Sequence, residues 1–190
     1  MIVNYTEVLY FLGLKSSDLD DYDETLIKTY INTAEELVLK YLNRGIEKAE
    51  YTEYISGKNT QKEILRNFPI DNNASFTLYY KNSFDAYTEI SADNYSVDYE
   101  RGIIYKASVF EEGFQNYKVV YTAGYDNENI PFAIKLAIKI FLKILWEKHD
   151  QNANGLVNYH AGDVIQKYDD SLIPIDVIRL LKSYKYYSFK

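Results

Sequence analysis

The 190-residue chain contains no cysteine, only three prolines and two histidines, and eight scattered glycines. Without cysteine, disulfide frameworks, thiolate metal sites and Cys–His nucleophiles are all excluded. The glycines never form the Gly-rich loops that bind phosphate in nucleotide-binding folds. Neither His149 nor His160 has further ligands at the spacing of a metal site. The sequence therefore contains no motif for nucleotide or metal binding, and we expect no cofactor.

Positive charge is also scarce. Only four residues are arginine, the net charge is −7, and the isoelectric point is near 4.9. Dedicated nucleic-acid binders gain most of their affinity by neutralising phosphates with Lys and Arg, so this acidic balance argues against that class. The most apolar run, residues 130–146, is interrupted by Lys135, Lys139 and Lys143, and we expect no membrane span. The first residues also lack the basic start and cleavage site of a secretory signal.

What the chain does contain is typical of a globular protein. Apolar residues make up 47% and charged residues 26% of the sequence. A chain of this length buries roughly 70% of its extended surface on folding, enough for a core without disulfides. Tyrosine is very abundant, with 21 residues. Its ring is apolar and its hydroxyl is polar, which suits half-buried sheets and wet interfaces.

Four segments have the apolar spacing of amphipathic helices, at about residues 6–12, 23–44, 131–149 and 174–185. We expect Thr6 and Asp23 to cap the first two helices, and Gly13 and Gly45 to end them. Pro131 and Pro174 suit the first turns of the last two helices. In the final helix, the residues expected to face inward are Ile175, Ile178 and Leu181, with Leu180 as a further candidate.

Between the second and third helices the apolar period changes to about two, which indicates strands. We predict strands at residues 50–57, 75–81 and 117–124, and a hairpin at 94–106 that turns at Gly102 with a positive φ. Residues 46–125 are therefore expected to form an antiparallel β-subdomain inserted into a small helical bundle. The predicted fold class is α+β, in one domain spanning residues 1–190.

The helix at 131–149 is apolar on almost every side, except for the stripe of Lys135, Lys139 and Lys143. Such a helix has to be surrounded, either by its own fold or by other copies of the chain. The long connection that follows, residues 150–173, has the length typical of functional or mobile loops, and a short strand is expected at 163–168. The lysines mark either a solvated face or an edge that meets a partner.

Carboxylates are the remaining candidates for chemistry. Their number alone does not exclude a two-carboxylate glycosidase, but Glu35, Asp98 and Glu112 all lie in ordinary helix or strand contexts. The acidic loop Asp18–Glu24 lacks the ligand order of a Ca²⁺-binding loop, and a solvated loop with a helix cap is the favoured interpretation. We predict no catalytic residue and no enzymatic activity.

The order of three segments resembles a known family, and the resemblance spans roughly residues 5–185. These segments are GKNTQKEILRNFPI before the sheet, VVYTAGY with IPFAIKLAI at the strand-to-helix junction, and the C-terminal stretch AGDVIQKYDDSLIPIDVIRLL. Together they resemble the head-to-tail connector proteins of tailed bacteriophages, also called adaptor or head-completion proteins. None of these segments is a catalytic signature, and it is their order over this length that supports the resemblance.

The resemblance implies a structural virion protein that assembles in the host cytoplasm and resides in the neck. Family members form homo-oligomeric rings, typically twelve-fold dodecamers, which join the portal to a stopper or tail-completion protein and surround the channel through which DNA passes. We expect an acidic or neutral lumen, with Lys135, Lys139 and Lys143 facing elsewhere. The larger, tyrosine-rich β-insertion departs from shorter members, and its use in the assembly is left open.

The residues expected at an interface with another subunit or with the portal lie on the apolar helix and on the long connection after it. They are Lys135, Lys139, Lys143, Trp146, Leu156, Tyr159, Val164, Tyr168 and Asp169. Two alternative functions stay open at this point. One is a tail-completion or terminator protein, although those are dominated by sheets. The other is a tyrosine-rich module that binds carbohydrate or peptide through the predicted sheet.

Overall fold

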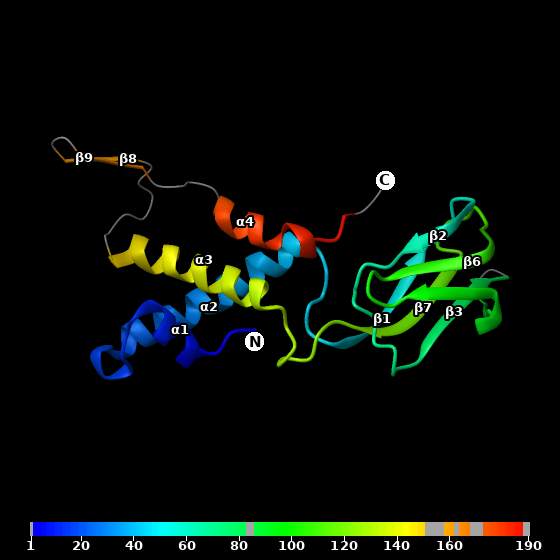
Figure 1. Ribbon diagram of the computed structural model, residues 1–190, viewed down its shortest axis with the longest axis horizontal. Coiled ribbons are helices and arrows are strands. Elements are labelled where there is room, and N and C mark those ends of the chain that lie inside the picture. Colours follow the sequence, from blue (N-terminus) through cyan, green and yellow to red (C-terminus); the bar gives the residue numbers. More distant parts are fainter. Residues whose placement is uncertain (1, 83–85, 151–157, 162–163, 168–172, 188–190) are drawn as a thin grey trace. The chain divides into compact units, whose positions relative to one another are not determined.

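The computed structural model describes residues 2–82, 86–150, 158–161, 164–167 and 173–187. For residues 150, 158–161 and 164–167 it describes the backbone alone. The chain divides into two compact units (Figure 1). One unit contains Met1–Leu42 and Ile130–Tyr187, and is helical. The other contains Asn43–Asn129 and is built from strands.

The described residues of the helical unit form four α-helices: α1 (Tyr5–Leu12), α2 (Asp21–Leu42), α3 (Phe132–Asp150) and α4 (Ile175–Leu181). Two single 3₁₀ turns accompany them, η1 (Ser16–Asp18) and η3 (Lys182–Tyr184). All four helices predicted from the apolar spacing are confirmed. The backbone between α3 and α4 includes a short antiparallel hairpin of β8 (Asn158–Ala161) and β9 (Val164–Lys167). The strand expected at 163–168 is therefore confirmed as β9, and its partner β8 was not predicted.

Helix α3 packs against α1, α2 and α4, which explains its apolar character. Ile134, Ala137, Ile138, Phe141 and Leu142 are buried along one stripe. Several apolar residues beside this stripe are half-buried, and Phe132 is 73% exposed. The helix is thus covered mainly by its own unit, with some apolar surface left over.

Several details of the helix ends differ from the predictions. The N-cap of α1 is Asn4, whose Oδ1 accepts from the Glu7 N–H at 2.8 Å, and Thr6 lies inside the helix. The N-cap role expected of Asp23 belongs to Asp20, which accepts from the Asp23 N–H at 2.8 Å. Both errors have one cause: each helix starts before the predicted residue, α1 at Tyr5 and α2 at Asp21, and the polar residue directly before that start is the cap.

The C-terminal predictions have mixed outcomes. Gly13 ends α1 in the left-handed conformation as expected. After α2, however, the positive φ belongs to Asn43, at 56°, and Gly45 has another role. The Gly45 backbone N–H donates to Asn67 Oδ1 at 2.7 Å, and a side chain at this position would overlap the Tyr51 hydroxyl. In α4, Val177 and Leu181 are buried, whereas Ile175 is 52% exposed, which contradicts its predicted inward position.

The β unit contains two antiparallel sheets. The larger sheet has the strand order β1-β7-β3-β4, and the smaller has the order β2-β6-β5. The bounds of the strands are β1 Ala49–Ile55, β2 Thr60–Ile64, β3 Phe76–Lys81, β4 Tyr87–Glu89, β5 Tyr95–Asp98, β6 Ile103–Phe110 and β7 Tyr117–Ala123, with a 3₁₀ turn η2 at Ala92–Asn94. The predicted strands and the β5–β6 hairpin are confirmed, and Gly102 has the expected positive φ of 66°. Strands β2 and β4 were missed.

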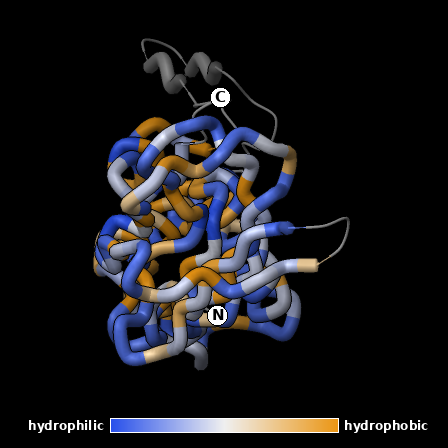
Figure 2. The backbone as a smooth tube through the Cα atoms, turned by 90° about the vertical axis from the view of Figure 1, so that its right-hand side faces the viewer, coloured by the Kyte–Doolittle hydropathy of each residue, from blue (hydrophilic) through white to orange (hydrophobic). Residues whose placement is uncertain are grey.

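The two sheets share one apolar core, in which aromatic rings join the strands. The Tyr117 ring on β7 lies 4.9 Å from the Phe110 ring on β6, edge to face, and 5.1 Å from the Tyr80 ring on β3. Figure 2 shows hydrophobic segments running through the middle of this unit and hydrophilic loops around them. The fully or nearly buried residues of this core are Leu65, Ile70, Leu78, Ile104, Phe110, Tyr117, Val119, Tyr121 and Ala123.

Candidate interaction surfaces

The predicted interface residues on α3 lie on one face of the helix but in different surroundings. Lys139 is only 16% exposed and its Nζ lies 2.8 Å from Glu7 Oε2 on α1. Lys143 is 53% exposed and lies 3.7 Å from Glu147, one turn further along α3. Lys135 is half-buried. At least one lysine of the stripe therefore has a role inside the helical unit, because Lys139 joins α3 to α1 through its ion pair with Glu7.

Trp146 belongs to an aromatic group near the C-terminal end of α3. Its ring lies 5.8 Å from the His149 ring, which in turn lies 6.4 Å from the Tyr22 ring near the start of α2. Trp146 is half-buried, and Tyr22 is 65% exposed. Within this group, Trp146 packs partly against its own unit, whereas the Tyr22 ring is mostly exposed to solvent.

The other predicted interface residues lie in the connection after α3. Leu156, Tyr168 and Asp169 fall outside the described residues. Tyr159 and Val164 lie on the backbone of β8 and β9 respectively. Their place at an interface remains a prediction.

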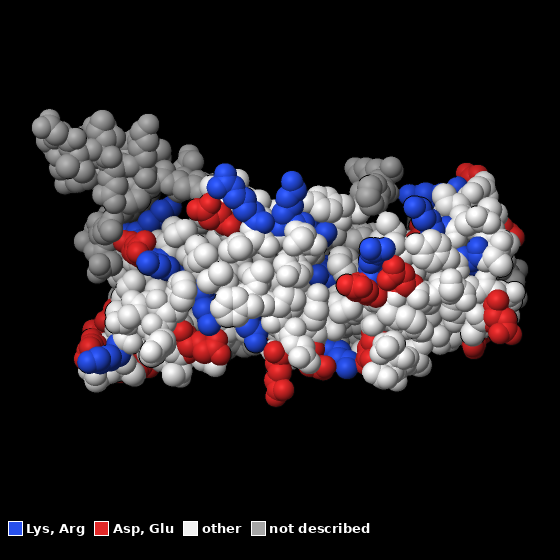
Figure 3. Space-filling model, viewed as in Figure 1, with Lys and Arg blue, Asp and Glu red and all other residues white. Residues whose placement is uncertain are grey.

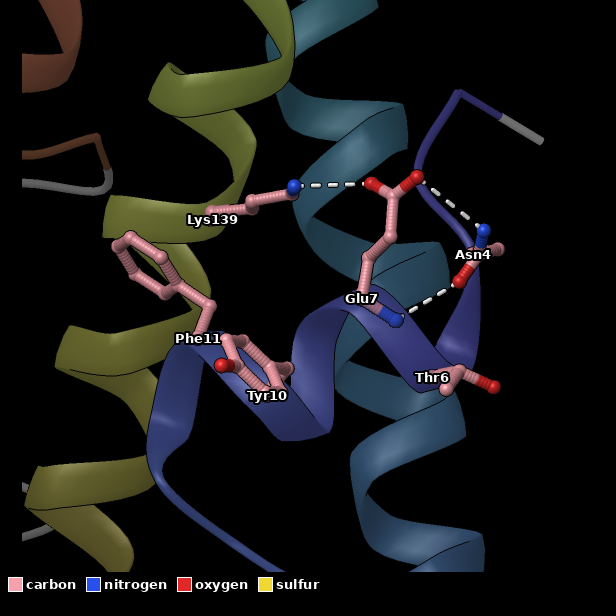
Figure 4. A pocket seen from close by; sticks show the side chains of 6 residues that line it. All are labelled: Asn4, Thr6, Glu7, Tyr10, Phe11 and Lys139. Atoms are coloured by element: carbon pink, nitrogen blue, oxygen red, sulfur yellow. Dashed lines mark hydrogen bonds and ion pairs between the residues drawn. The ribbon is translucent and has the colours of Figure 1, made fainter.

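A hollow of about 420 Å³ opens between α1 and α3 (Figure 4). Its apolar walls are the rings of Tyr10 and Phe11 from α1, and Figure 4 shows the Phe11 ring beside α3. Tyr10 is 90% exposed, so its ring forms a rim rather than a floor. The polar wall is the Glu7–Lys139 ion pair, with Asn4 and Thr6 beside it.

The Glu7 carboxylate in the polar wall of this hollow is held by Lys139 and Asn4. The hydrogen bond from the Lys139 ammonium, together with the nearby charges of Lys139 and Lys135, lowers the pKa of Glu7 against the opposing effect of burial. Asn4 Nδ2 also donates to Glu7 Oε1 at 3.2 Å. The cap of α1 and the α1–α3 ion pair therefore share a single carboxylate.

A second exposed apolar feature lies in the β unit, on the turn between β6 and β7. Phe114 is 83% exposed at the tip of this turn. Nothing in the sequence singled out this residue, because an isolated phenylalanine between glycine and glutamine gives no periodic pattern. The signal that was available is the pair Glu111–Glu112 followed by Gly113, which marks a polar turn around one apolar residue.

Hydrogen bonds hold this turn on both sides. The buried Asn116 side chain accepts from the Gly57 N–H at 3.0 Å and donates to the Glu111 carbonyl at 2.9 Å. The Gly113 N–H donates to the Gly57 carbonyl at 3.2 Å. A side chain at Gly57 would overlap the Glu111 carbonyl, and one at Gly113 would overlap Asn116. The turn is thus fixed by close backbone contacts.

The bonds next to Phe114 complete this support. The Gln115 N–H donates to Ser56 Oγ at 3.0 Å, and the Tyr87 hydroxyl donates to the Gln115 carbonyl at 2.9 Å. Gln115 has a positive φ of 46°. Phe114 is therefore presented to solvent on a preorganised turn.

The carboxylates considered for chemistry have structural roles. Glu35 accepts from the Ile2 and Val3 N–H groups at 2.7 and 2.9 Å, which fixes the start of the chain to α2. Asp98 accepts from the Arg101 N–H at the hairpin turn, and Glu112 exchanges hydrogen bonds with Asn59. In the described part of the chain, no group of three His, Asp or Glu side chains has the arrangement of a metal site. No helix there has both the length and the apolar character that crossing a bilayer requires.

Acidic and basic side chains are interspersed on the face drawn in Figure 3, and the described residues form no continuous basic patch there. This distribution differs from the basic face of proteins that bind nucleic acid through phosphate contacts. The exposed features on the described surface are instead isolated aromatic residues. They are Tyr10, Tyr22, Tyr54, Phe114 and Phe132, each more than half exposed.

Comparison with known proteins gives a family and a fold. The profile of the head completion protein family, HCP, matches residues 1–187. None of the curated protein sequences is a detectable relative of the chain.

Three solved structures are similar over almost the whole chain. A chain in the virion of a native gene transfer agent (GTA) particle has a TM-score of 0.61 and 12% identity, covering 100% of this chain and 92% of that chain. A chain in the neck of the empty GTA particle, computed with C6 symmetry, has a TM-score of 0.60 and 11% identity, with the same coverage. A chain in the neck of the native particle, computed with C12 symmetry, has a TM-score of 0.55 and 12% identity, and covers 96% of this chain and 90% of that one. At these identities the similarity establishes a shared fold.

Proposed function

The chain belongs to the head completion protein family and is a structural component of the head–tail junction of a virion; from this we propose that it forms the ring that joins the portal to the tail side of the neck. The observation that carries the proposal is the family match over residues 1–187, which includes both units. The role is structural rather than enzymatic. The ring surrounds the channel through which DNA passes.

Twelve-fold symmetry is the proposed state of the assembled ring. It is supported by the similar fold of a chain in a GTA neck computed with C12 symmetry. A ring requires each copy to make a heterologous contact with the next, so each copy presents two different surfaces. The leftover apolar surface of α3 and the isolated exposed aromatic residues are the kind of surface that such contacts bury.

The lumen of the ring is proposed to be acidic or neutral. A lumen lined with lysine and arginine would retain DNA by releasing counterions, which opposes free passage. The net charge of −7 agrees with this proposal. The position of Lys139, only 16% exposed and paired with Glu7, also supports it, because this lysine is already used between α1 and α3.

Negative-stain electron microscopy tests the proposal. The purified protein is imaged alone and after mixing with the portal protein encoded in the same genome. Portal rings that gain an additional tier support the connector role. Portal rings that stay unchanged at high concentrations of the protein, with only monomers beside them, contradict it.

A further inference from the structure

The turn at Phe114 presents an exposed aromatic ring, and the hollow between α1 and α3 is lined in part by aromatic rings. Phe114 is 83% exposed, on a turn fixed by hydrogen bonds to Gly57, Ser56 and Tyr87. An aromatic ring on a rigid turn loses little conformational freedom on binding, so the entropic cost of ordering it is small. The turn therefore has the character of a preformed knob.

The hollow has the size and chemistry to receive such a ring. Its volume of about 420 Å³ exceeds the ~150 Å³ of an apolar cavity that holds a benzene molecule. Tyr10 and Phe11 supply aromatic walls, and aromatic pairs favour edge-to-face and offset contacts. Aromatic residues are enriched among the interface residues that contribute most to binding.

The charges around the two features are also complementary. The knob is flanked by the exposed carboxylates Glu111 and Glu112. The face of α3 beside the hollow carries Lys135, Lys139 and Lys143 against two neighbouring carboxylates, Glu7 and Glu147. Acidic residues that approach a face bearing a stripe of lysines are favoured in encounter and in register.

We propose that the Phe114 knob of one copy inserts into the α1–α3 hollow of a second copy, and that this contact joins neighbouring subunits. The inference rests on the proposed ring, since it assigns the two different surfaces that a heterologous contact requires. The lysine stripe then has a definite role: Lys143, which is 53% exposed, meets the carboxylates of the knob, while Lys139 holds the hollow in shape through Glu7.

Photo-crosslinking identifies the occupant of the hollow directly. The amino acid p-benzoylphenylalanine at position 114 keeps an aromatic knob, and ¹⁵N-labelled protein mixed with unlabelled protein separates crosslinks between copies from those within a copy. We expect mixed-isotope crosslinks from position 114 to residues 4–11 or to α3 near Lys139. Crosslinks to the portal chain, to other segments of a second copy, or only within one copy would overturn the proposal.

Substitution gives a second test that is independent of the probe. Phe114→Ala should weaken self-association in portal-bound rings by about 10- to 100-fold, the range expected for removing a buried aromatic side chain. Tyr105→Ala is the matched control, because Tyr105 is an aromatic residue in the same unit, 43% exposed on β6. Circular dichroism checks that both variants remain folded.

The two proposals fail in different ways. If wild-type protein adds no tier to the portal, the proposed function fails. If it adds the tier and Phe114→Ala does so at the same concentrations, the ring stands and the knob-in-hollow contact is refuted.

Discussion

The hydroxyl of Tyr121 offers a sharp test of what holds the β unit together. Tyr121 is fully buried on β7, with its ring 6.0 Å from the rings of Tyr51 and Phe76. Its hydroxyl hydrogen-bonds to the Glu53 carboxylate on β1 and accepts from the Asn67 N–H at 3.3 Å. Burial and the neighbouring Glu53 charge both raise the pKa of Tyr121, so the phenol stays protonated and donates. Tyr121→Phe removes this oxygen and leaves the ring packing in place.

The expected cost follows from the partners that remain. Hydrogen bonds to charged groups contribute about 1.5–3 kcal/mol. Glu53 keeps two other donors, Asn67 Nδ2 at 3.0 Å and the Arg66 N–H at 3.1 Å, so it is not left as an unpaired charge. We therefore expect a loss of about 2 kcal/mol in the free energy of unfolding, near the lower end of that range. For a chain of this size this lowers Tm by about 4–8 °C.

The assay is urea unfolding followed by two probes. Far-UV circular dichroism reports on both units, whereas the single tryptophan, Trp146, lies on α3 and reports on the helical unit. Tyr51→Phe is the control, because that hydroxyl makes only an exposed 3.3 Å bond to the Glu47 carbonyl. A loss below about 0.5 kcal/mol in Tyr121→Phe, equal to the control, would refute the role of this hydroxyl.

Three further predictions concern the two interaction surfaces. Because Lys139 lowers the pKa of Glu7, this carboxylate stabilises the fold above its ordinary pKa of 4.5, and the contribution is lost as the pH falls through the lowered value. Glu7→Gln should therefore flatten the decline of unfolding free energy below pH 4.5; a profile identical to that of the wild-type protein would contradict the assignment. Asn4→Ala should cost about 1 kcal/mol in thermal unfolding by removing the α1 cap, and a change below 0.3 kcal/mol would argue against this cap. Gly57→Ala should destabilise the β unit by about 2 kcal/mol or more, since its Cβ overlaps the Glu111 carbonyl, and an unchanged Tm would show that the turn is not held as described.

The sequence predicted the elements that have a clear period and missed those that do not. Helix α2 was predicted because its apolar residues recur over 22 residues. Strand β3 alternates cleanly, and Phe76, Leu78 and Tyr80, which share one face of the strand, are the residues that join the core. Strands β2 and β4 were missed because TQKEI is mostly polar and exposed, and YTE is too short to show a period.

The candidate surfaces depend on contacts that no local pattern shows. The lysine stripe on α3 was visible in the sequence, but the burial of Lys139 requires Glu7, which lies 132 residues earlier on another helix. The Phe114 turn depends on Gly57 and Asn116, which are 59 residues apart. The two N-caps were misplaced by a few residues, since capping requires the exact start of a helix and the apolar period only indicates where its buried face begins.

The central claim is that this chain forms a ring on the portal, and native mass spectrometry of the mixed proteins tests it most directly. Twelve copies of the 22.3 kDa chain should add about 268 kDa to each portal ring, with no abundant species carrying one or two copies. A portal mass that does not change with a large excess of the protein would contradict the account. A gain that rises one copy at a time without stopping at a closed ring would contradict it as well.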